Sequence, residues 1–479
     1  MEQRKFFSDV AFTQITNLLI KAVWILVIDR AVQNILSDYG AYYKLLSLSI
    51  LFLVFLDLGL NSLNTTKIAQ DPSALKAHLG PFMKTKALLA LGYMVVLWMS
   101  AQLLNLNTEQ RWILVSVGGF QVINSFNQLL RSNIAAYHRF KLDAVLAVLD
   151  RVLVILILGT LLYVPSFQGH LTIRNFVLAQ IVGSATTFIV AFGLVFSLHR
   201  KIQQAVQNIS IKEVLTSALP YALLATMMAI YTRVDAVMIG QLIGDIETDR
   251  YAMCYRLIDA GNMVAASLSA MLLPIFSKLI TKREELTRMT QLSSRLLLVP
   301  VALFVVLALP HVKWLLEGMY PDKLGLQSPE TFALLLLSFI ASSSIYIYGT
   351  LLTAAAKLKS LNTLAVTASV LNIVLNFILI PKQGIEGAAL ATMATQLLFA
   401  AGCFWKGRLL MVQTNPLRGR TGKAILFLAV FTPMYMWSKE ILTNDLQHIM
   451  AGIGVALIGL NVIGFVRKSD IQELLRRKT

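Results

Sequence analysis

The sequence has few of the residues that carry catalysis, metal binding or covalent cross-links. It contains two cysteines, Cys254 and Cys403, each inside an apolar segment, and two isolated thiols exclude a disulfide framework or a cysteine metal site. Its six histidines lie in loops or at segment ends without HExxH-like spacing, and no glycine-rich phosphate loop is present. The sequence therefore predicts no catalytic residue, metal or cofactor, and we expect a protein that is not an enzyme.

Charged residues are also scarce. They make up 14% of the chain against 57% hydrophobic residues, and the mean hydropathy is +0.68, so a soluble globule could not bury this much apolar surface. We expect an all-α polytopic membrane protein, in which about 20 mostly apolar residues form each spanning helix. About fourteen segments qualify: 8–28, 40–63, 83–104, 112–135, 143–163, 176–198, 215–240, 251–277, 293–311, 331–355, 361–380, 386–405, 422–438 and 447–466.

The few charges are distributed unevenly between alternate loops. Cytoplasmic loops of membrane proteins carry an excess of Lys and Arg, and with the N-terminus inside, the loops on that side hold most of the 42 such residues. We therefore expect both termini in the cytoplasm. The same rule largely explains the net charge of +17, so we expect no nucleic-acid partner.

A short pattern occurs twice in the chain. Tyr43-Lys44-Leu45 follows the first predicted helix and Tyr255-Arg256-Leu257 the seventh, each after Asp, Ala and Val and a short polar turn. Six helices separate the copies, so the halves have the same orientation, as in parallel-repeat transporters. We expect two six-helix lobes, at 1–205 and 206–408, and an additional two-helix segment with a basic cytoplasmic tail at 409–479.

Two predicted helices have a polar side. Residues three and four apart share one face of a helix, and a face this polar cannot point to lipid. We favour a water-filled pathway lined by these residues, because polar residues buried in membranes usually mark one. Hydrogen bonds between helices are the alternative, and Arg131 also fits an anchor at the cytoplasmic end. The residues are Gln14, Asn17 and Lys21 of the first helix and Gln121, Asn124, Gln128 and Arg131 of the fourth.

Four ions lie in the outer parts of the seventh and eighth predicted helices. Arg256 and Asp259 are three residues apart and share a face, whereas Arg233 and Asp235 are about 200° apart around a helix and cannot share one. For Asp235 the simplest explanation is a salt bridge between helices, because charges inside a membrane pair.

Arg256 also fits a binding role. Its counterpart in the repeat is Lys44, which has Ser47 at the position that matches Asp259. A cation present in both halves suggests an anion bound between them.

Two further acids lie inside predicted helices. Asp57 is opposite Lys44 by helical angle, and a base at the cytoplasmic end of the helices would be its simplest partner. Asp150 is next to Arg151, and neighbours on a helix are expected to point in different directions. Either acid is a candidate for protonation in a transport cycle, although no spacing indicates it.

One stretch resembles a known family. "LNIVLNFILIPKQGIEGAALATMATQ" at 371–396 resembles the signature of polysaccharide and lipid-linked oligosaccharide flippases in the multidrug, oligosaccharidyl-lipid and polysaccharide exporter superfamily. "RVDAVMIG" and "LLPIFSKL" resemble two further family marks. By its residues alone, the stretch predicts a tight outer turn at Pro381 and Gly384 and a shared face for Asn372 and Asn376. Small residues after the turn allow close helix approach: Gly387, Ala388, Ala389 and Ala391.

The resemblance implies two six-helix lobes around a central cavity that opens alternately to each side. It further implies outward movement of an undecaprenyl-diphosphate-linked oligosaccharide across the bacterial cytoplasmic (inner) membrane, with the last two helices helping to hold the lipid tail. The anionic diphosphate would bind fixed cations: Lys21, Lys44, Arg233 and Arg256. The expected partners are the lipid-linked glycan and membrane lipids, with glycan-assembly enzymes as candidates. Two alternatives stay open, a cation-coupled multidrug exporter and an integral-membrane glycan polymerase or ligase.

Overall fold

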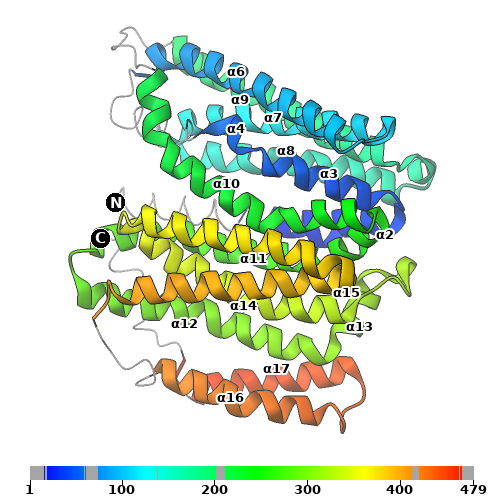
Figure 1. Ribbon diagram of the computed structural model, residues 1–479, viewed down its shortest axis with the longest axis vertical. Helices are drawn as coiled ribbons and strands as arrows, with labels where there is room; N and C mark the ends of the chain where they lie inside the picture. The colour runs from blue at the N-terminus through cyan, green and yellow to red at the C-terminus, as the bar shows by residue number, and fades with distance from the viewer. Residues whose placement is uncertain are drawn as a thin grey trace. The chain divides into compact units, whose positions relative to one another are not determined.

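The chain is almost entirely helical (Figure 1). The structure, a computed structural model, contains no strand in the residues that it describes, which are 16, 19–58, 60, 74–136, 139–200, 211–412, 420–462 and 464–465. Two of the predicted site residues, Gln14 and Asn17, lie outside them.

Long apolar helices confirm the predicted fold class. Within the described residues, nine helices are long and apolar enough to span a membrane, and the chain is a multi-pass membrane protein. Helices are expected here because lipid offers no hydrogen bond to the backbone, so each N–H and C=O must pair within its own segment. The helices before residue 243 are η1 (Trp24–Asp29), α2 (Arg30–Ile35), α3 (Tyr39–Leu51), α4 (Val54–Asp57), α6 (Ala74–Leu103), α7 (Thr108–Ala136), α8 (Phe140–Tyr163), η2 (Pro165–His170), α9 (Ile173–Arg200) and α10 (Ile211–Leu242). Those after it are α11 (Asp245–Leu279), α12 (Arg283–Ala308), η3 (Leu309–His311), α13 (Val312–Met319), η4 (Pro321–Lys323), α14 (Pro329–Ala354), α15 (Leu358–Arg408), α16 (Arg420–Ser438) and α17 (Asp445–Val462).

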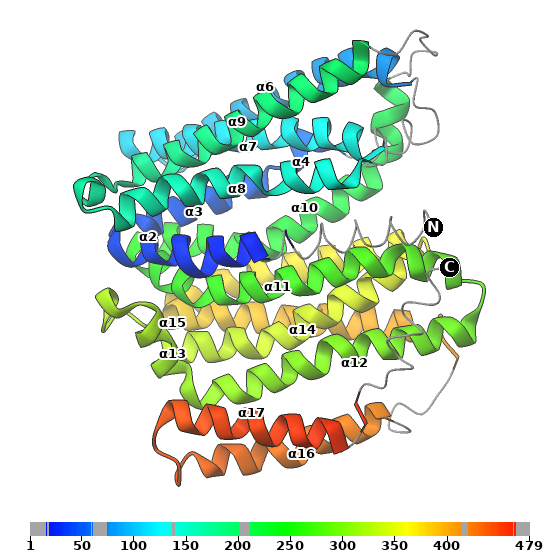
Figure 2. The ribbon, with the colours of Figure 1, turned by 180° about the vertical axis from the view of Figure 1, so that it is seen from behind.

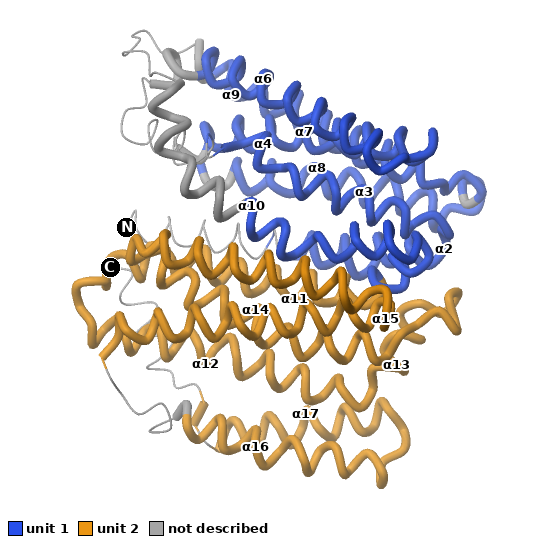
Figure 3. The backbone as a smooth tube through the Cα atoms, in the orientation of Figure 1, with its two compact units in different colours: residues 1–252 blue, residues 253–479 orange. Residues whose placement is uncertain are grey.

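Residues 1–252 form the first of two compact units (Figure 3). Within it, α7 packs against α3, α6, α8 and α9, and α10 packs against α3. Apolar side chains of α6, α7, α8 and α9 meet in one buried cluster: Leu79, Leu130, Ile134, Leu146, Ala191 and Val195. The polar side chains of α3, α7, α8 and α10 are therefore held by a well-packed helical scaffold.

The second predicted helix, 40–63, is broken in the structure. Helix α3 ends at Leu51, α4 covers only Val54–Asp57, and Leu58 then adopts a left-handed backbone with φ 43°. The prediction of a continuous helix was wrong here because the apolar run continues through the break, and residues 50–58 contain neither proline nor glycine. The first helix is also irregular, since Trp24–Asp29 is a π-helix, a form that often occurs at functional sites.

Residues 253–479 form the second compact unit. Helix α14 packs against α12 and α15, and the α16–α17 pair packs against α12. Figure 2 shows α16 and α17 side by side next to α12. Their contact is apolar and includes the buried residues Phe431, Tyr435 and Ala456. Within the second unit, the two C-terminal helices are therefore held against α12 by apolar contacts.

The predicted turn at Pro381 and Gly384 is confirmed within α15. This element joins two helices through Gly384, whose backbone angles of φ 60° and ψ −138° are not helical and suit a residue without a Cβ. The predicted close approach also occurs, because a Cβ added at Gly387 would lie 2.4 Å from the carbonyl oxygen of Leu379. Asn372 and Asn376 share a buried face, where the Asn376 amide donates to Asn372 at 3.2 Å.

The division between the compact units falls inside a continuous helix. Residues 245–252 of α11 belong to the first unit and its later residues to the second. The predicted lobes at 1–205 and 206–408 rest on the repeat in the sequence, and the additional segment 409–479 lies outside that repeat. All three stay a prediction.

Candidate functional site

Lys21 is an exposed cation near other charges of the first unit. It lies on the first predicted helix, within electrostatic reach of Arg131, Arg151 and Asp150. On the spanning helix that the sequence predicts here, an exposed lysine side chain would face either lipid or water. A charged group is much less stable in lipid, so we expect Lys21 to face water. We call the residues Lys21, Arg131, Arg151, Asp143 and Asp150 the cation cluster.

Arg151 on α8 is held by aromatic rings. Its guanidinium lies 5.2 Å from the centroid of Trp24 and 5.6 Å from that of Phe120, which are cation–π distances. Arg151 Nε is also 3.6 Å from Asp150 Oδ2. The expectation that these neighbours point apart was wrong, because the long arginine side chain folds back toward the acid beside it.

The predicted polar face of α7 has mixed surroundings. Gln121 is buried and Gln128 is exposed, while Asn124 accepts a hydrogen bond from Ser184 Oγ of α9 at 3.3 Å. At the end of this face, Arg131 Nε donates to Asp143 of α8 at 2.7 Å. The face therefore combines hydrogen bonds between helices with an exposed polar side chain.

Lys44 has an acid partner that sequence reasoning missed. Lys44 on α3 is only 4% exposed, and its Nζ lies 2.5 Å from Oδ1 of Asp245, the first residue of α11. The other carboxylate oxygen of Asp245 accepts from Gln110 of α7 at 2.9 Å. Asp245 therefore ties α3 and α7 to the start of α11.

Arg233 lies close to the same part of α3. It is half-buried on α10 and donates to the phenol oxygen of Tyr43 at 3.1 Å. Two turns further along α10, the side chain of Lys44 lies against Gly240, where an added Cβ would be 2.2 Å from Lys44 Cδ. Arg233 and Lys44 are thus held in one unit by adjacent residues of α3. We call Tyr43, Lys44, Arg233 and Asp245 the tyrosine–lysine site.

Three buried acids of the first unit receive hydrogen bonds from neutral side chains. Tyr251 donates to Asp235 at 3.0 Å, Tyr39 to Asp29 at 2.9 Å, and the amide of Gln33 to Asp249 at 2.9 Å. None of these acids is more than 5% exposed. A phenol or amide can satisfy a buried carboxylate. Asp235 therefore has at least one neutral partner, Tyr251, and the salt bridge expected for it stays a prediction.

The acid expected beside Arg256 is confirmed in the second unit. Arg256 Nη1 lies 3.8 Å from Asp259 Oδ2, one turn further along α11, and their side chains are 10% and 13% exposed. The spacing in the sequence predicted this shared face.

Asp57 pairs with a basic residue, as the sequence predicted. Lys86 of α6 donates to Asp57 Oδ1 at 2.7 Å, and the lysine side chain is fully buried. Lys86 was missed because it lies at the edge of an apolar segment, close to Lys84, and resembles a loop charge.

The tyrosines are the other class of residue that sequence reasoning missed. Tyr39, Tyr43 and Tyr251 are each at most 3% exposed and each contacts a charged group. The available signal is a phenol inside an apolar segment, because a buried Tyr O–H usually has a hydrogen-bond partner.

The arrangement of helices is that of membrane transporters. Over 96% of this chain and 98% of the other, it matches the lipid II flippase MurJ in an inward closed conformation, with a TM-score of 0.69 and 16% identity. It also matches an outward-facing multidrug resistance MATE family transporter of the MOP superfamily, at a TM-score of 0.59 and 13% identity over 85% and 95% of the chains. A MOP superfamily transporter from Pyrococcus furiosus matches at 0.54 and 12% over the same shares. The chain therefore shares the fold of these proteins.

The sequence also places the chain in a protein family. Residues 7–280, more than half of the chain, match the family described as polysaccharide biosynthesis protein. The chain belongs to this family of polysaccharide biosynthesis proteins. Among curated proteins, none matches the sequence.

Proposed function

We propose that the protein is a flippase that moves an undecaprenyl-diphosphate-linked oligosaccharide across the bacterial cytoplasmic membrane by alternating access. The observation that carries this proposal is the cation cluster, in which Lys21 is exposed and lies near Arg131 and Arg151. A diphosphate is a compact anion that fixed cations bind through charge-assisted hydrogen bonds. An apolar drug would gain nothing from the three cations of this cluster.

Family and fold support a lipid-linked substrate. The family match is to polysaccharide biosynthesis, and the match to MurJ, a lipid II flippase by its description, covers 96% of the chain. The multidrug transporter covers only 85%, and the remaining share has the size of the two-helix segment 409–479. The longer match to the lipid flippase supports the proposed role of the last two helices in holding the lipid tail.

The remaining site residues keep their proposed roles. In this proposal Lys44, Arg233 and Arg256 also contact the diphosphate, and Asp57, Asp150, Asp235 and Asp259 serve as ion-pair or coupling residues. The proposed polar lining of the pathway consists of Gln14, Asn17, Gln121, Asn124 and Gln128.

Transport in vesicles tests the proposal. The purified protein is placed in liposomes with a fluorescent undecaprenyl-diphosphate-linked sugar, and the label that reaches the other leaflet is measured. Lys21→Ala should reduce transport at least tenfold with the amount of folded protein unchanged, whereas Lys21→Arg should keep part of the activity because its charge remains. The matched control is Arg174→Gln, an exposed arginine that forms an ion pair with Glu109, and it should transport normally.

Other outcomes would identify the alternatives. Cation-driven transport of a drug, without movement of the lipid-linked sugar, would indicate a multidrug exporter. A lengthened glycan made by the protein alone would indicate a polymerase or ligase. Equal loss of folded protein in both Lys21 variants would indicate a packing role for this residue.

Thiol labelling tests the proposed orientation. Both native cysteines are buried, so an introduced cysteine reports alone. Leu324 and Lys282 are 66% exposed and 64% exposed at the side chain, respectively. Leu324→Cys should react with an impermeant maleimide from outside intact cells, and Lys282→Cys only after lysis. The reverse pattern would overturn the cytoplasmic placement of both termini.

A further inference from the structure

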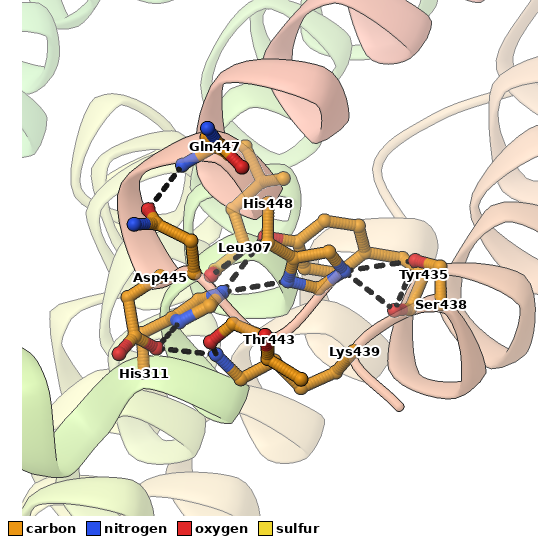
Figure 4. A network of polar contacts seen from close by, with 10 residues as sticks. Leu307, His311, Tyr435, Ser438, Lys439, Thr443, Asp445, Gln447 and His448 are labelled. Carbon is orange, nitrogen blue, oxygen red and sulfur yellow. Dashed lines mark hydrogen bonds and ion pairs between the residues drawn. The ribbon is translucent and has the colours of Figure 1, made fainter. Parts of the chain in front are cut away.

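A buried pair of histidines lies where the α16–α17 hairpin meets the end of α12 (Figure 4). His311 belongs to η3, which follows α12, and His448 lies on α17. Both are 1% exposed, and His311 Nε2 lies 2.8 Å from His448 Nδ1. The transport function proposed above does not use these residues.

Each end of this pair faces oxygen atoms. At one end, His311 Nδ1 lies 2.5 Å from Oδ1 of Asp445. At the other end, His448 Nε2 lies 2.8 Å from Ser438 Oγ and 3.2 Å from the backbone carbonyl oxygen of Tyr435. The result is one chain of hydrogen bonds that runs from Asp445 through both rings to the last turn of α16.

The number of protons in this chain depends on the direction of the Ser438 hydroxyl. Ser438 Oγ is 2.8 Å from the Tyr435 carbonyl oxygen and can donate to it. His448 Nε2 must then carry a proton, because it faces only acceptors. Three hydrogen bonds link Asp445, His311, His448 and Ser438, and each needs one proton. Two neutral imidazole rings supply two of these protons, so the third must be taken up from outside.

The opposite direction needs no additional proton. If Ser438 donates to His448 Nε2 instead, His448 Nδ1 donates to His311 Nε2, and His311 Nδ1 donates to the ionised Asp445. Every group is again satisfied, by two neutral rings. The phenol of Tyr435, 3.2 Å from His311 Nε2 and 3.4 Å from the carbonyl oxygen of Leu307, keeps its proton in both arrangements.

We propose that the histidine pair is a binding site for a single proton, and that the bound proton latches the α16–α17 hairpin to the end of α12. Uptake of one H⁺ from water reverses the two hydrogen bonds of His448, which then donates to Ser438 and accepts from His311 Nε2. His311 still donates to the ionised Asp445 and carries the added charge, and no other group gains or loses a proton. The added charge converts the contact between His311 and Asp445 into an ionic one between η3 and α17. Such a bond is stronger than one from a neutral ring.

The titratable groups beside the histidine pair lie mainly at its Asp445 end, which is also the end that water reaches. Among the described residues, the titratable groups that face the pair are Asp445, Lys439 and Tyr435. Lys439 Nζ lies 2.5 Å from Asp445 Oδ1, and the two side chains are 26% and 28% exposed. Water therefore reaches the Asp445 end, while the rings are closed off. Lys439 opposes the extra charge and Asp445 favours it.

Apolar contacts also hold the hairpin, so the bound proton strengthens its attachment to α12 without being required for it. The hairpin also packs on α12 through Phe431, Tyr435 and Ala456 against Leu303 and Leu307. Loss of the proton should therefore loosen the end of the hairpin near Asp445 without detaching it.

Nitrogen NMR of the histidine rings in the full-length protein tests the proton count. In wild type, two of the six histidines should share one titration, and the signal of the remaining ring should change in His311→Gln and in His448→Gln. His170, exposed in η2, supplies the control variant His170→Gln, which should leave the shared titration unchanged. Independent titration of the two rings would overturn the proposal.

Two variants that keep both rings should shift the titration in opposite directions. Ser438→Ala removes the donor that the proton-free arrangement requires, so the pair should keep its proton to higher pH. Asp445→Asn removes the negative charge, so the pair should lose its proton at a pH at least one unit lower, a tenfold weaker proton affinity. If the histidine pair has only a structural role, the two variants need not shift the titration in opposite directions. Shifts of the same sign would overturn the proposal.

Hydrogen exchange tests the latch itself. After correction for the intrinsic exchange rate, amides near the start of α17 should be protected at least threefold more at pH 6 than at pH 8 in wild type and in His170→Gln. In Ser438→Ala the protection should persist at pH 8. Equal protection of wild type at both pH values would show that the proton does not act as a latch.

Discussion

The two tyrosine–cation pairs of the repeat, Tyr43-Lys44 on α3 and Tyr255-Arg256 on α11, are similarly buried but are neutralised differently. Lys44 is 4% exposed and Arg256 8%. The acid of Lys44 is Asp245, at the start of a distant helix, at 2.5 Å. The acid of Arg256 is Asp259, one turn along the same helix, at 3.8 Å.

This difference shows that a cation can recur in both halves of the sequence while the acid that neutralises it comes from a different place in each half. At Lys44 the tertiary fold supplies the acid, so the ion pair fastens α3 to the start of α11. At Arg256 the acid comes from the same helix, so this ion pair by itself joins two positions of α11. We infer that the first ion pair contributes more to the stability of the fold than the second.

The largest effect is expected from Arg256→Gln. Because the proposed diphosphate contact would lose its cation in the second unit, transport of the lipid-linked sugar should fall at least tenfold while the protein stays folded. The vesicle assay and the yield of monodisperse protein measure the two quantities. The control is Lys313→Gln, an exposed cation of the same unit. Normal export by Arg256→Gln, or its rescue by Asp235→Asn, would assign the diphosphate role elsewhere.

The next largest effect is expected from Asp245→Asn. It leaves Lys44 buried without its acid, which costs several kcal/mol in a closed site. Because Asp245 is a third exposed, water reduces the loss to about 2 kcal/mol. Unfolding in mixed detergent micelles measures it. The double variant Lys44→Met with Asp245→Asn should recover most of the loss, and a further loss there would contradict the ion-pair explanation.

A smaller loss is expected from Tyr43→Phe. The change removes the phenol oxygen that accepts from Arg233 and keeps the ring, so the free energy of unfolding should fall by about 1 kcal/mol. Tyr163→Phe, at a tyrosine that is 61% exposed, is the control and should be neutral. Equal values for the two variants would show that the Arg233 contact does not stabilise the first unit.

The smallest effect is expected from Asp259→Asn. A pair three residues apart on one helix at 3.8 Å contributes about 0.5 kcal/mol. The same unfolding measurement compares it with Asp245→Asn. A loss equal to that of Asp245→Asn would remove the contrast between the two pairs.

Hydropathy predicted the helices well because each spanning segment is a long apolar run. It failed at 51–54, where the run continues through a break in the helix. Spacing along one helix predicted the contact between Arg256 and Asp259, since both residues lie on the same element. It could not find Asp245 for Lys44, because only the tertiary fold brings these residues together. The histidine pair was missed for the same reason, since His311 and His448 come from distant helix ends.

The close fit of Lys44 against Gly240 has a consequence for related sequences. The methylene groups of the lysine occupy the volume that a side chain at position 240 would need. Positions 44 and 240 therefore share one fixed volume and should change together during evolution. Chains with a larger residue at 240 should carry a shorter one at 44, and those chains would have to place their positive charge on another helix.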